Sequence, residues 1–154
     1  MAVININRNQ FEEMVHSGKT VLVEFSAPWC VYCRRLTPAL ESVAEEYKDT
    51  LVFTAVNIDD EPELAETEAI EVVPTLLIYH SGQALGSIVA PESRAQLVAF
   101  IEETLQHQTQ EANTVHLYAS LTLEEARKTS IKDKQSQIIR SSEHILALLN
   151  SEKV

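Results

Sequence analysis

Cysteine and cationic residues are scarce in this sequence, and each scarcity excludes a class of protein. Its 154 residues include 2 cysteines, and its 5 histidines are scattered without an H-x-x-x-H pair. A structural zinc ion takes four such ligands, so no metal site is expected. Lysine and arginine total 12 against 23 acidic residues, for a formal net charge of −11. Nucleic acids and anionic membranes bind clustered cations, so neither is an expected partner.

Long hydrophobic runs are absent as well. A membrane-spanning helix needs ~20 consecutive apolar residues, and no stretch of the sequence approaches that length. The first residues lack the basic segment of a secretory signal, and Asn5 interrupts their apolar stretch. We therefore expect a cytoplasmic protein.

Apolar residues nevertheless make up 45% of the chain, enough for a folded core. β-branched and apolar stretches predict strands at residues 3–6, 20–26, 51–58, 75–79 and 84–89. Apolar residues at helical spacing predict a helix after each of the first three strands and after the last. Strands that alternate with helices pair in parallel, whereas the closing hairpin is antiparallel. The expected fold class is α/β, with a central mixed β-sheet flanked by helices on both faces.

A second, smaller part of the chain follows this pattern. Residues 106–113 are polar and glutamine-rich, which we interpret as a linker, and residues 115–118 are strand-like. Helices are predicted from Thr122 onward and across residues 134–150, which carry an apolar stripe at Ile138, Ile145 and Leu149.

These features predict a domain at residues 1–106 and a mainly helical C-terminal extension at residues 107–154. We expect the extension to pack back on the domain or to contact a homodimer partner or another protein, because exposed leucine and isoleucine favour burial. The alternative is a loose appendage.

The two cysteines, Cys30 and Cys33, form a C-x-x-C pair where the helix after the central strand is expected to begin. Unpaired backbone N–H groups and the helix dipole stabilise a thiolate at a helix N-terminus, and the thiolate is the form that attacks a disulfide. We therefore predict that Cys30 is the exposed, attacking residue. Cys33, nearly one turn later, can then attack the mixed disulfide and release the reduced product.

Two buried free cysteines are the alternative interpretation of this pair, since cysteine is often buried. The position argues against it. The pair follows a Pro-Trp turn at the carboxyl end of a central strand, which is where α/β sheets bind ligands. Redox chemistry is the preferred interpretation.

Glu24 is the one acidic residue in the otherwise apolar strand at residues 20–26. A buried carboxylate is costly unless it is paired or protonated, so burial is expected to raise its pKa towards a value suited to proton transfer. The alternative is a position at the end of the sheet, from which the side chain reaches solvent.

Two separate motifs resemble the thioredoxin family. Residues 25–33, with the pattern F-x-A-P-W-C-x-x-C, are similar to the active-site stretch of thioredoxins and protein disulfide isomerase domains. Val73-Pro74-Thr75 is similar to the family's cis-proline loop. The resemblance covers about residues 2–106 and implies a thioredoxin-like fold.

The resemblance also implies catalytic roles. Cys30 matches the family nucleophile and Cys33 the resolving cysteine. Glu24 matches a buried acid beneath the resolving cysteine that helps to move its proton. Neither a metal ion nor an organic cofactor is needed for this chemistry.

Three further residues match positions that bind substrate. Pro74 matches the cis proline beside the disulfide, and Val73 before it would offer its backbone N–H and C=O groups to an extended peptide. Trp29 matches an aromatic residue beside the site, although simple packing is an equal alternative for it.

The sequence also departs from the family pattern. The dipeptide between the cysteines is Val31-Tyr32, where general thioredoxins have Gly-Pro and disulfide isomerases Gly-His. Ala55 stands where many thioredoxins carry a lysine that pairs with the buried acid, and Ala90 stands at a position that is usually glycine.

The sequence thus predicts a thiol–disulfide oxidoreductase that reduces disulfides in protein substrates. The resemblance implies that a flavin-dependent thioredoxin reductase or a low-molecular-weight thiol recycles it. A disulfide isomerase or oxidase is one alternative, which the Val31-Tyr32 dipeptide allows. The other is an interaction module that acts through its C-terminal extension.

Overall fold

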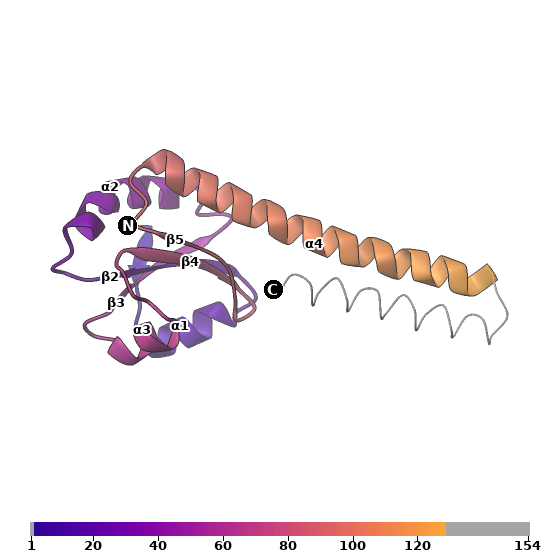
Figure 1. Ribbon diagram of the computed structural model, residues 1–154, viewed down its shortest axis with the longest axis horizontal. Coiled ribbons are helices and arrows are strands. Elements are labelled where there is room, and N and C mark those ends of the chain that lie inside the picture. Colours follow the sequence, from indigo (N-terminus) through magenta and orange to yellow (C-terminus); the bar gives the residue numbers. More distant parts are fainter. Residues whose placement is uncertain (1, 129–154) are drawn as a thin grey trace. The chain divides into compact units, whose positions relative to one another are not determined.

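The computed structural model describes residues 2–128 (Figure 1). The elements follow in the order β1 (Val3–Asn5), α1 (Arg8–Val15), β2 (Thr20–Ser26), α2 (Val31–Glu46), β3 (Val52–Asn57), α3 (Pro62–Thr67), β4 (Thr75–His80), β5 (Gln83–Val89) and α4 (Arg94–Lys128). This order confirms the predicted alternation of strands and helices and the closing hairpin. The chain divides after Leu105 into two units, Met1–Leu105 and Gln106–Val154.

One mixed sheet holds the five strands in the order β1-β3-β2-β4-β5. β3 pairs in parallel with both β1 and β2, while β4 runs antiparallel to β2 and to β5. Because β4 is antiparallel, its first residues lie at the same edge as the last residues of β2, with Phe25 opposite Thr75. The segments that follow β2 and β3 therefore meet the segment that precedes β4 at one edge of the sheet.

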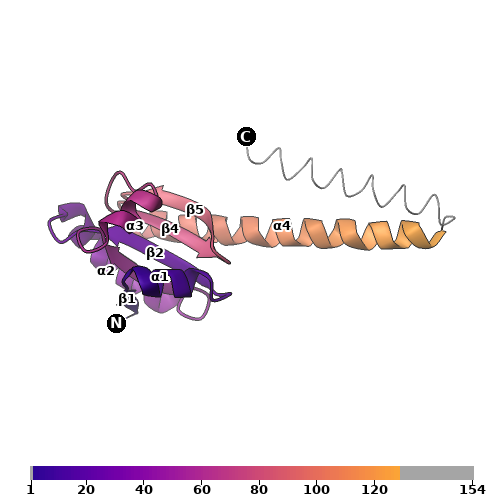
Figure 2. The ribbon, with the colours of Figure 1, turned by 90° about the horizontal axis from the view of Figure 1, so that it is seen from below.

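Helices cover both faces of this sheet, as predicted (Figures 1 and 2). Side chains alternate along a strand, so Leu22 in β2 points to one face and Val23 to the other. Leu22 belongs to a cluster with residues of α2 and the first turns of α4, among them Leu36, Leu40, Leu97 and Ile101. Val23 belongs to a second cluster with residues of α1 and α3, among them Phe11, Val15 and Leu64.

Burial of these apolar side chains holds the helices against the sheet. Phe11 of α1 meets Phe25 and Tyr79 edge to face, with ring centroids 6.3 and 5.3 Å apart. Fully burying one such side chain contributes about 1.5–3 kcal/mol, so a few of them suffice to hold a helix on the sheet. The start of α1 is fixed in addition by a capping box, in which Asn7 and Gln10 each bond the other's backbone N–H.

The last helix runs further than the sequence predicts. α4 is one helix through Lys128, so the linker expected at residues 106–113 and the strand expected at residues 115–118 are both wrong. Thr122 likewise lies within this helix and does not begin a new one. No glycine or proline follows Pro91 in the sequence, and glutamine, glutamate and alanine are good helix formers. A helix therefore continues through a polar stretch that has no apolar stripe.

The second half of the predicted extension lies outside the described residues. This concerns the helix expected at residues 134–150 and its stripe of Ile138, Ile145 and Leu149. Within residues 2–128, no helix is both long enough and apolar enough to cross a membrane.

Candidate active site

The site lies at the sheet edge where three loops meet. The loop after β2 carries Trp29 and Cys30, the loop after β3 carries Asp59, and the loop before β4 carries Val73 and Pro74. Residues up to 45 positions apart in the sequence thus come together because of the strand order. This follows from the pairing of β2 with both β3 and β4.

Cys30 is the N-cap residue of α2, in the extended conformation that precedes a helix (φ −83°, ψ 112°). Its Sγ accepts a hydrogen bond from the Cys33 backbone N–H at 3.1 Å. The expected helix-start position of Cys30 is confirmed, and its sulfur receives the stabilisation that a capping oxygen would. Cys30 and Cys33 are joined as a disulfide, with their Cα atoms 5.3 Å apart.

The expected exposure of Cys30 is wrong. Cys30 is 5% exposed and Cys33 is 4% exposed, so accessibility does not distinguish the two sulfurs. Both pack in a small cluster with Ala27, and Val73 lies against that cluster. The loop that brings Val73 over the disulfide is remote in sequence, which is why the helix-start argument missed this cover. The hydrogen bond from Cys33 is what sets Cys30 apart.

Val73 and Pro74 lie beside this disulfide. The Val73–Pro74 peptide bond is cis, and the Val73 carbonyl oxygen is 3.6 Å from the Cys30 Sγ. The loop is tied to the residue that follows β5 by a hydrogen bond from the Ala90 N–H to the Pro74 carbonyl at 2.8 Å. Within the described part of the chain, the Val73 N–H donates no hydrogen bond. It is therefore free to bind an incoming peptide.

Glu24 is buried in the middle of β2, at 5% exposure. The alternative of a solvent-reaching side chain is therefore wrong. Burial raises its pKa to about 7; a hydrogen bond with Ser26 opposes that rise, and the charge of Glu41 adds to it. In the parallel register Glu24 stands beside Ala55, at the position where many thioredoxins carry lysine. No ion pair joins Glu24 to a cation in the part of the chain that the structure describes.

A small cavity of about 220 Å³ lies between Glu24 and Cys33. Glu24 and Cys33 both line it, together with the polar residues Ser26, Arg34, Thr37, Asn5 and Asn57. A cavity with such a lining is large enough for water and offers it hydrogen-bond partners. A proton can therefore pass between Cys33, Glu24 and solvent.

Trp29 does not pack into the core, since it is 63% exposed. Its indole Nε1 donates a hydrogen bond to an Asp59 carboxylate oxygen at 3.2 Å, which fixes the ring across two loops. The packing alternative for Trp29 is therefore wrong. Tyr32 is exposed to a similar degree, at 65%, so two aromatic rings lie in solvent beside a buried disulfide.

Sequence reasoning gave no role to four residues around the site. Asp59 holds Trp29, Glu41 acts on Glu24 through its charge, and Arg35 and Glu92 line a groove next to Val73. Asp59 had a detectable signal, because it follows a parallel strand next to β2 and so comes to the same sheet edge. Within residues 2–128, no group of three or more side chains could hold a metal ion.

A helix-start cysteine paired with a second cysteine one turn later, above a buried carboxyl that titrates near neutral pH, makes a site for thiol–disulfide exchange. Comparison with known proteins gives the same class. The sequence profile of the family described as Thioredoxin matches residues 2–103. The chain therefore belongs to the thioredoxin family.

Individual relatives agree with this result, and the match covers nearly the whole length of the two bacterial proteins named next. The thioredoxin of Acidithiobacillus ferridurans is 38% identical over 105 residues, covering 68% of this chain and 97% of that protein. The thioredoxin of Buchnera aphidicola subsp. Baizongia pistaciae is 35% identical over 100 residues, covering 64% of this chain and 92% of that one. A chloroplastic M-type thioredoxin of Chlamydomonas reinhardtii is 34% identical over 101 residues, covering 65% and 72%.

The predicted family, fold and activity are thereby confirmed. The chain is a thiol–disulfide oxidoreductase with a redox-active C-x-x-C pair, and it acts as a protein-disulfide reductase. Its substrates are proteins with disulfides, and a reductase recycles it.

Proposed function

We propose that Cys30 is the attacking thiolate of this reductase and Cys33 the resolving thiol. The observation that carries the proposal is the hydrogen bond from the Cys33 N–H to the Cys30 Sγ at the start of α2. A negative sulfur gains more from that donor and from the helix dipole than a neutral one does. Cys33 lies inside the helix, one turn on, and receives no such donor from a residue of the described chain.

The reaction then proceeds in two exchanges. The Cys30 thiolate attacks one sulfur of a substrate disulfide, the substrate S–S bond breaks, and its other sulfur leaves as a thiolate that takes up a proton. Cys33 then loses its proton and attacks the Cys30 sulfur of the mixed disulfide. The second substrate sulfur leaves, so two electrons pass from the dithiol to the substrate and Cys30–Cys33 becomes the disulfide.

Glu24 is proposed to accept the Cys33 proton in the second exchange. A base serves best when its pKa lies near the working pH, and the pKa of Glu24 is raised by burial to about 7. The cavity that Glu24 shares with Cys33 supplies the route for the proton. Ala55 beside it leaves the carboxyl without the cation that would lower this pKa.

Val73, Pro74 and Trp29 are proposed to bind the substrate. An extended peptide laid along the loop would bond the free Val73 N–H, in the manner of an added strand. Pro74 holds that loop through the Ala90 N–H, and the exposed Trp29 ring offers apolar contact next to Cys30. Such contacts bind any extended peptide, which suits an enzyme with several protein substrates.

Reduction of the insulin disulfides in the presence of dithiothreitol tests the assignment of the cysteines. The full chain should accelerate precipitation of the insulin B chain, and Cys30→Ser should abolish the acceleration. Cys33→Ser should instead trap a mixed disulfide with insulin, detectable by mass. A trapped complex that forms with Cys30→Ser and not with Cys33→Ser would reverse the two roles.

The location and the recycling partner are also proposals. We place the protein in the cytoplasm, because its only cysteines are the redox pair and a reductase works best where thiols stay reduced. A flavin-dependent thioredoxin reductase or a low-molecular-weight thiol would return Cys30–Cys33 to the dithiol. Cell fractionation, and recycling assays with NADPH plus reductase against glutathione, distinguish these possibilities.

The C-terminal extension is proposed to contact a second copy of the chain or another protein. The support is the length of α4, which continues to Lys128, and Leu117 on it, which is 59% exposed. The sequence stripe at Ile138, Ile145 and Leu149 adds apolar surface. Light scattering of the full chain measures the homodimer directly.

A further inference from the structure

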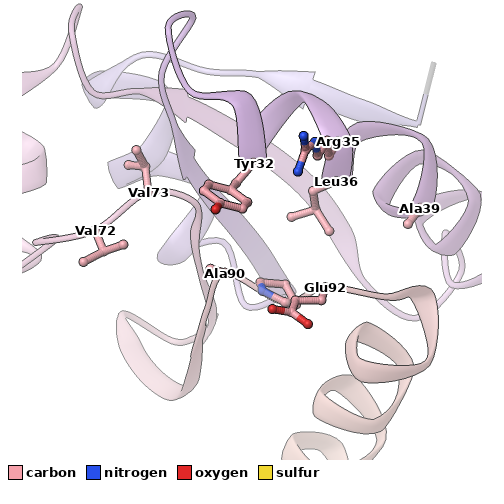
Figure 3. Close-up of a pocket in the computed structure, with 9 residues that line it drawn as sticks. Tyr32, Arg35, Leu36, Ala39, Val72, Val73, Ala90 and Glu92 are labelled. Carbon is pink, nitrogen blue, oxygen red and sulfur yellow. The ribbon is translucent and has the colours of Figure 1, made fainter.

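A second cavity shares no lining residue with the one at Glu24. It is a groove of about 460 Å³, lined by Tyr32 and Arg35 of α2, by Val72 and Val73, and by Ala90 and Glu92 of the loop before α4. Figure 3 shows the α2 side chains on one side and Ala90 and Glu92 on the other, with Val72 and Val73 at one end. Val73 lines the groove and its carbonyl oxygen is 3.6 Å from the Cys30 Sγ, so the groove lies next to the disulfide. A peptide bound there would have its own cysteine at the mouth of this groove.

Among the described residues of the domain, half of the six lysines and arginines form an ion pair with a glutamate, and Arg35 is not one of them. Arg8, Lys48 and Arg94 each form an ion pair with a glutamate. The Arg35 guanidinium instead lies over the Tyr32 ring, with its carbon 5.8 Å from the ring centroid. Among the residues that the structure describes, no carboxylate lies within ion-pair distance of Arg35. The contact with Tyr32 therefore holds a positive group in the groove without neutralising it.

This arrangement matters because the chain as a whole is acidic, with a formal net charge of −11. An unneutralised arginine on such a surface attracts a negative group. Glu92 lies in the same groove and repels a negative group from that end. The groove is thus polarised, positive at Arg35 and negative at Glu92.

We propose that Tyr32 and Arg35 select disulfide substrates that carry an acidic side chain next to the attacked cysteine. The carboxylate would bind the Arg35 guanidinium, which presents a planar fork of donors suited to it. The apolar part of the same side chain would lie on Tyr32. Tyr32 then contributes to the choice of substrate, since Pro in its place, as in general thioredoxins, has no aromatic ring to hold the arginine. This selectivity rests on the proposed function, in which Cys30 attacks a peptide held along Val73.

Symmetric peptide disulfides test the selectivity. A short peptide with one cysteine, flanked on both sides by Glu, Gln or Lys, is oxidised to its dimer so that both sulfurs are equivalent. The reduced full chain is mixed with each dimer, and kcat/KM is divided by the rate with dithiothreitol to remove intrinsic reactivity. We expect the Glu dimer to be reduced fastest and the Lys dimer slowest. The Glu-to-Gln ratio is the normalised kcat/KM for the Glu dimer divided by that for the Gln dimer. Arg35→Gln should lower this ratio about two- to fivefold, which corresponds to the free energy of an exposed ion pair.

Lys19→Gln is the matched control. Lys19 is an exposed lysine at the opposite end of β2, and its loss changes the net charge by the same amount. The Glu-to-Gln ratio should stay at the wild-type value in Lys19→Gln and should rise in Glu92→Gln. High salt should reduce the wild-type preference, because it screens exposed charges.

The possible outcomes distinguish failure of the proposed selectivity from failure of the proposed catalytic role of Cys30. Equal normalised rates for the three dimers, or the same fall in Lys19→Gln as in Arg35→Gln, would overturn the selectivity and leave the reductase assignment intact. A Glu-to-Gln ratio that does not rise in Glu92→Gln would overturn the polarity of the groove. If the wild type reduces none of the dimers, or Cys30→Ser reduces them as well, the proposed catalytic role fails instead.

Discussion

Glu24 in β2 stands directly beside Ala55 in β3, so the buried carboxyl has a methyl group where a cation would otherwise lie. Among the residues that the structure describes, the charge that perturbs it is that of Glu41, which raises its pKa further. Its pKa of about 7 is therefore a property of burial in this sheet, and it makes the second exchange sensitive to pH in the neutral range.

The resolving step should accelerate as the pH rises through 7, because Glu24 becomes able to accept the Cys33 proton. Glu24→Gln should slow this step at least about tenfold and remove the inflection, in line with the loss of a general base. Stopped-flow decay of a preformed mixed disulfide measures it. Glu41→Gln is the control: the inflection should persist and move to lower pH, since a repelling charge is gone. Identical pH profiles for the wild type and Glu24→Gln would mean that Glu24 takes no part.

The same carboxyl should make stability depend on pH. In the unfolded chain its pKa is near the ordinary 4.5, and in the folded chain it is about 7. Between these values the folded state keeps a proton that the unfolded state has lost, so stability falls as the pH rises from about 4.5 to 7. Relative to Glu24→Gln, the wild type should lose up to about 3 kcal/mol across this window. Urea unfolding of the two oxidised proteins at a series of pH values tests this expectation. A difference in unfolding free energy between the wild type and Glu24→Gln that stays constant with pH would contradict it.

Alkylation should distinguish the two cysteines despite their equal burial. After reduction, iodoacetamide at neutral pH should label Cys30 first, because its sulfur accepts the Cys33 N–H. Peptide mapping after brief treatment identifies the labelled residue, and Cys33→Ser should react as fast as the wild type. Preferential labelling of Cys33 would contradict the proposed roles.

Ala90 has a left-handed backbone, with φ of +46°, at a position that is usually glycine in the family. A non-glycine residue with this backbone conformation costs about 1–2 kcal/mol, and glycine removes that cost. Part of the gain is offset because glycine has more conformational entropy to lose on folding. Ala90→Gly should therefore raise the free energy of unfolding by about 0.5–1 kcal/mol. Ala84→Gly, in the extended strand β5, should lower it by a similar amount. Chemical denaturation compares the two, and destabilisation by both substitutions would exclude backbone strain at Ala90.

The sequence by itself determined most of the elements and the chemistry. Period-two and helical patterns are local, so they marked β2, the helix that begins after Cys30 and the closing hairpin. The C-x-x-C pair, Pro74 and the acid in an apolar strand each stand out without knowledge of neighbours. The extent of α4 was also a local property, because the absence of glycine and proline after Pro91 favours a continuous helix. The polar composition of residues 106–113 led instead to the prediction of a linker.

Only the tertiary structure decided what surrounds these residues. Val73 covers Cys30 from 43 positions away, and Asp59 reaches Trp29 from 30 positions away. The groove between Arg35 and Glu92 likewise joins two segments remote in sequence. Such contacts depend on which strands pair and in which register, and on the side chains that fill the space between them. A pattern along one segment holds no information about the segment that packs against it, so the cover over Cys30 and the polarity of the groove emerge only from the folded chain.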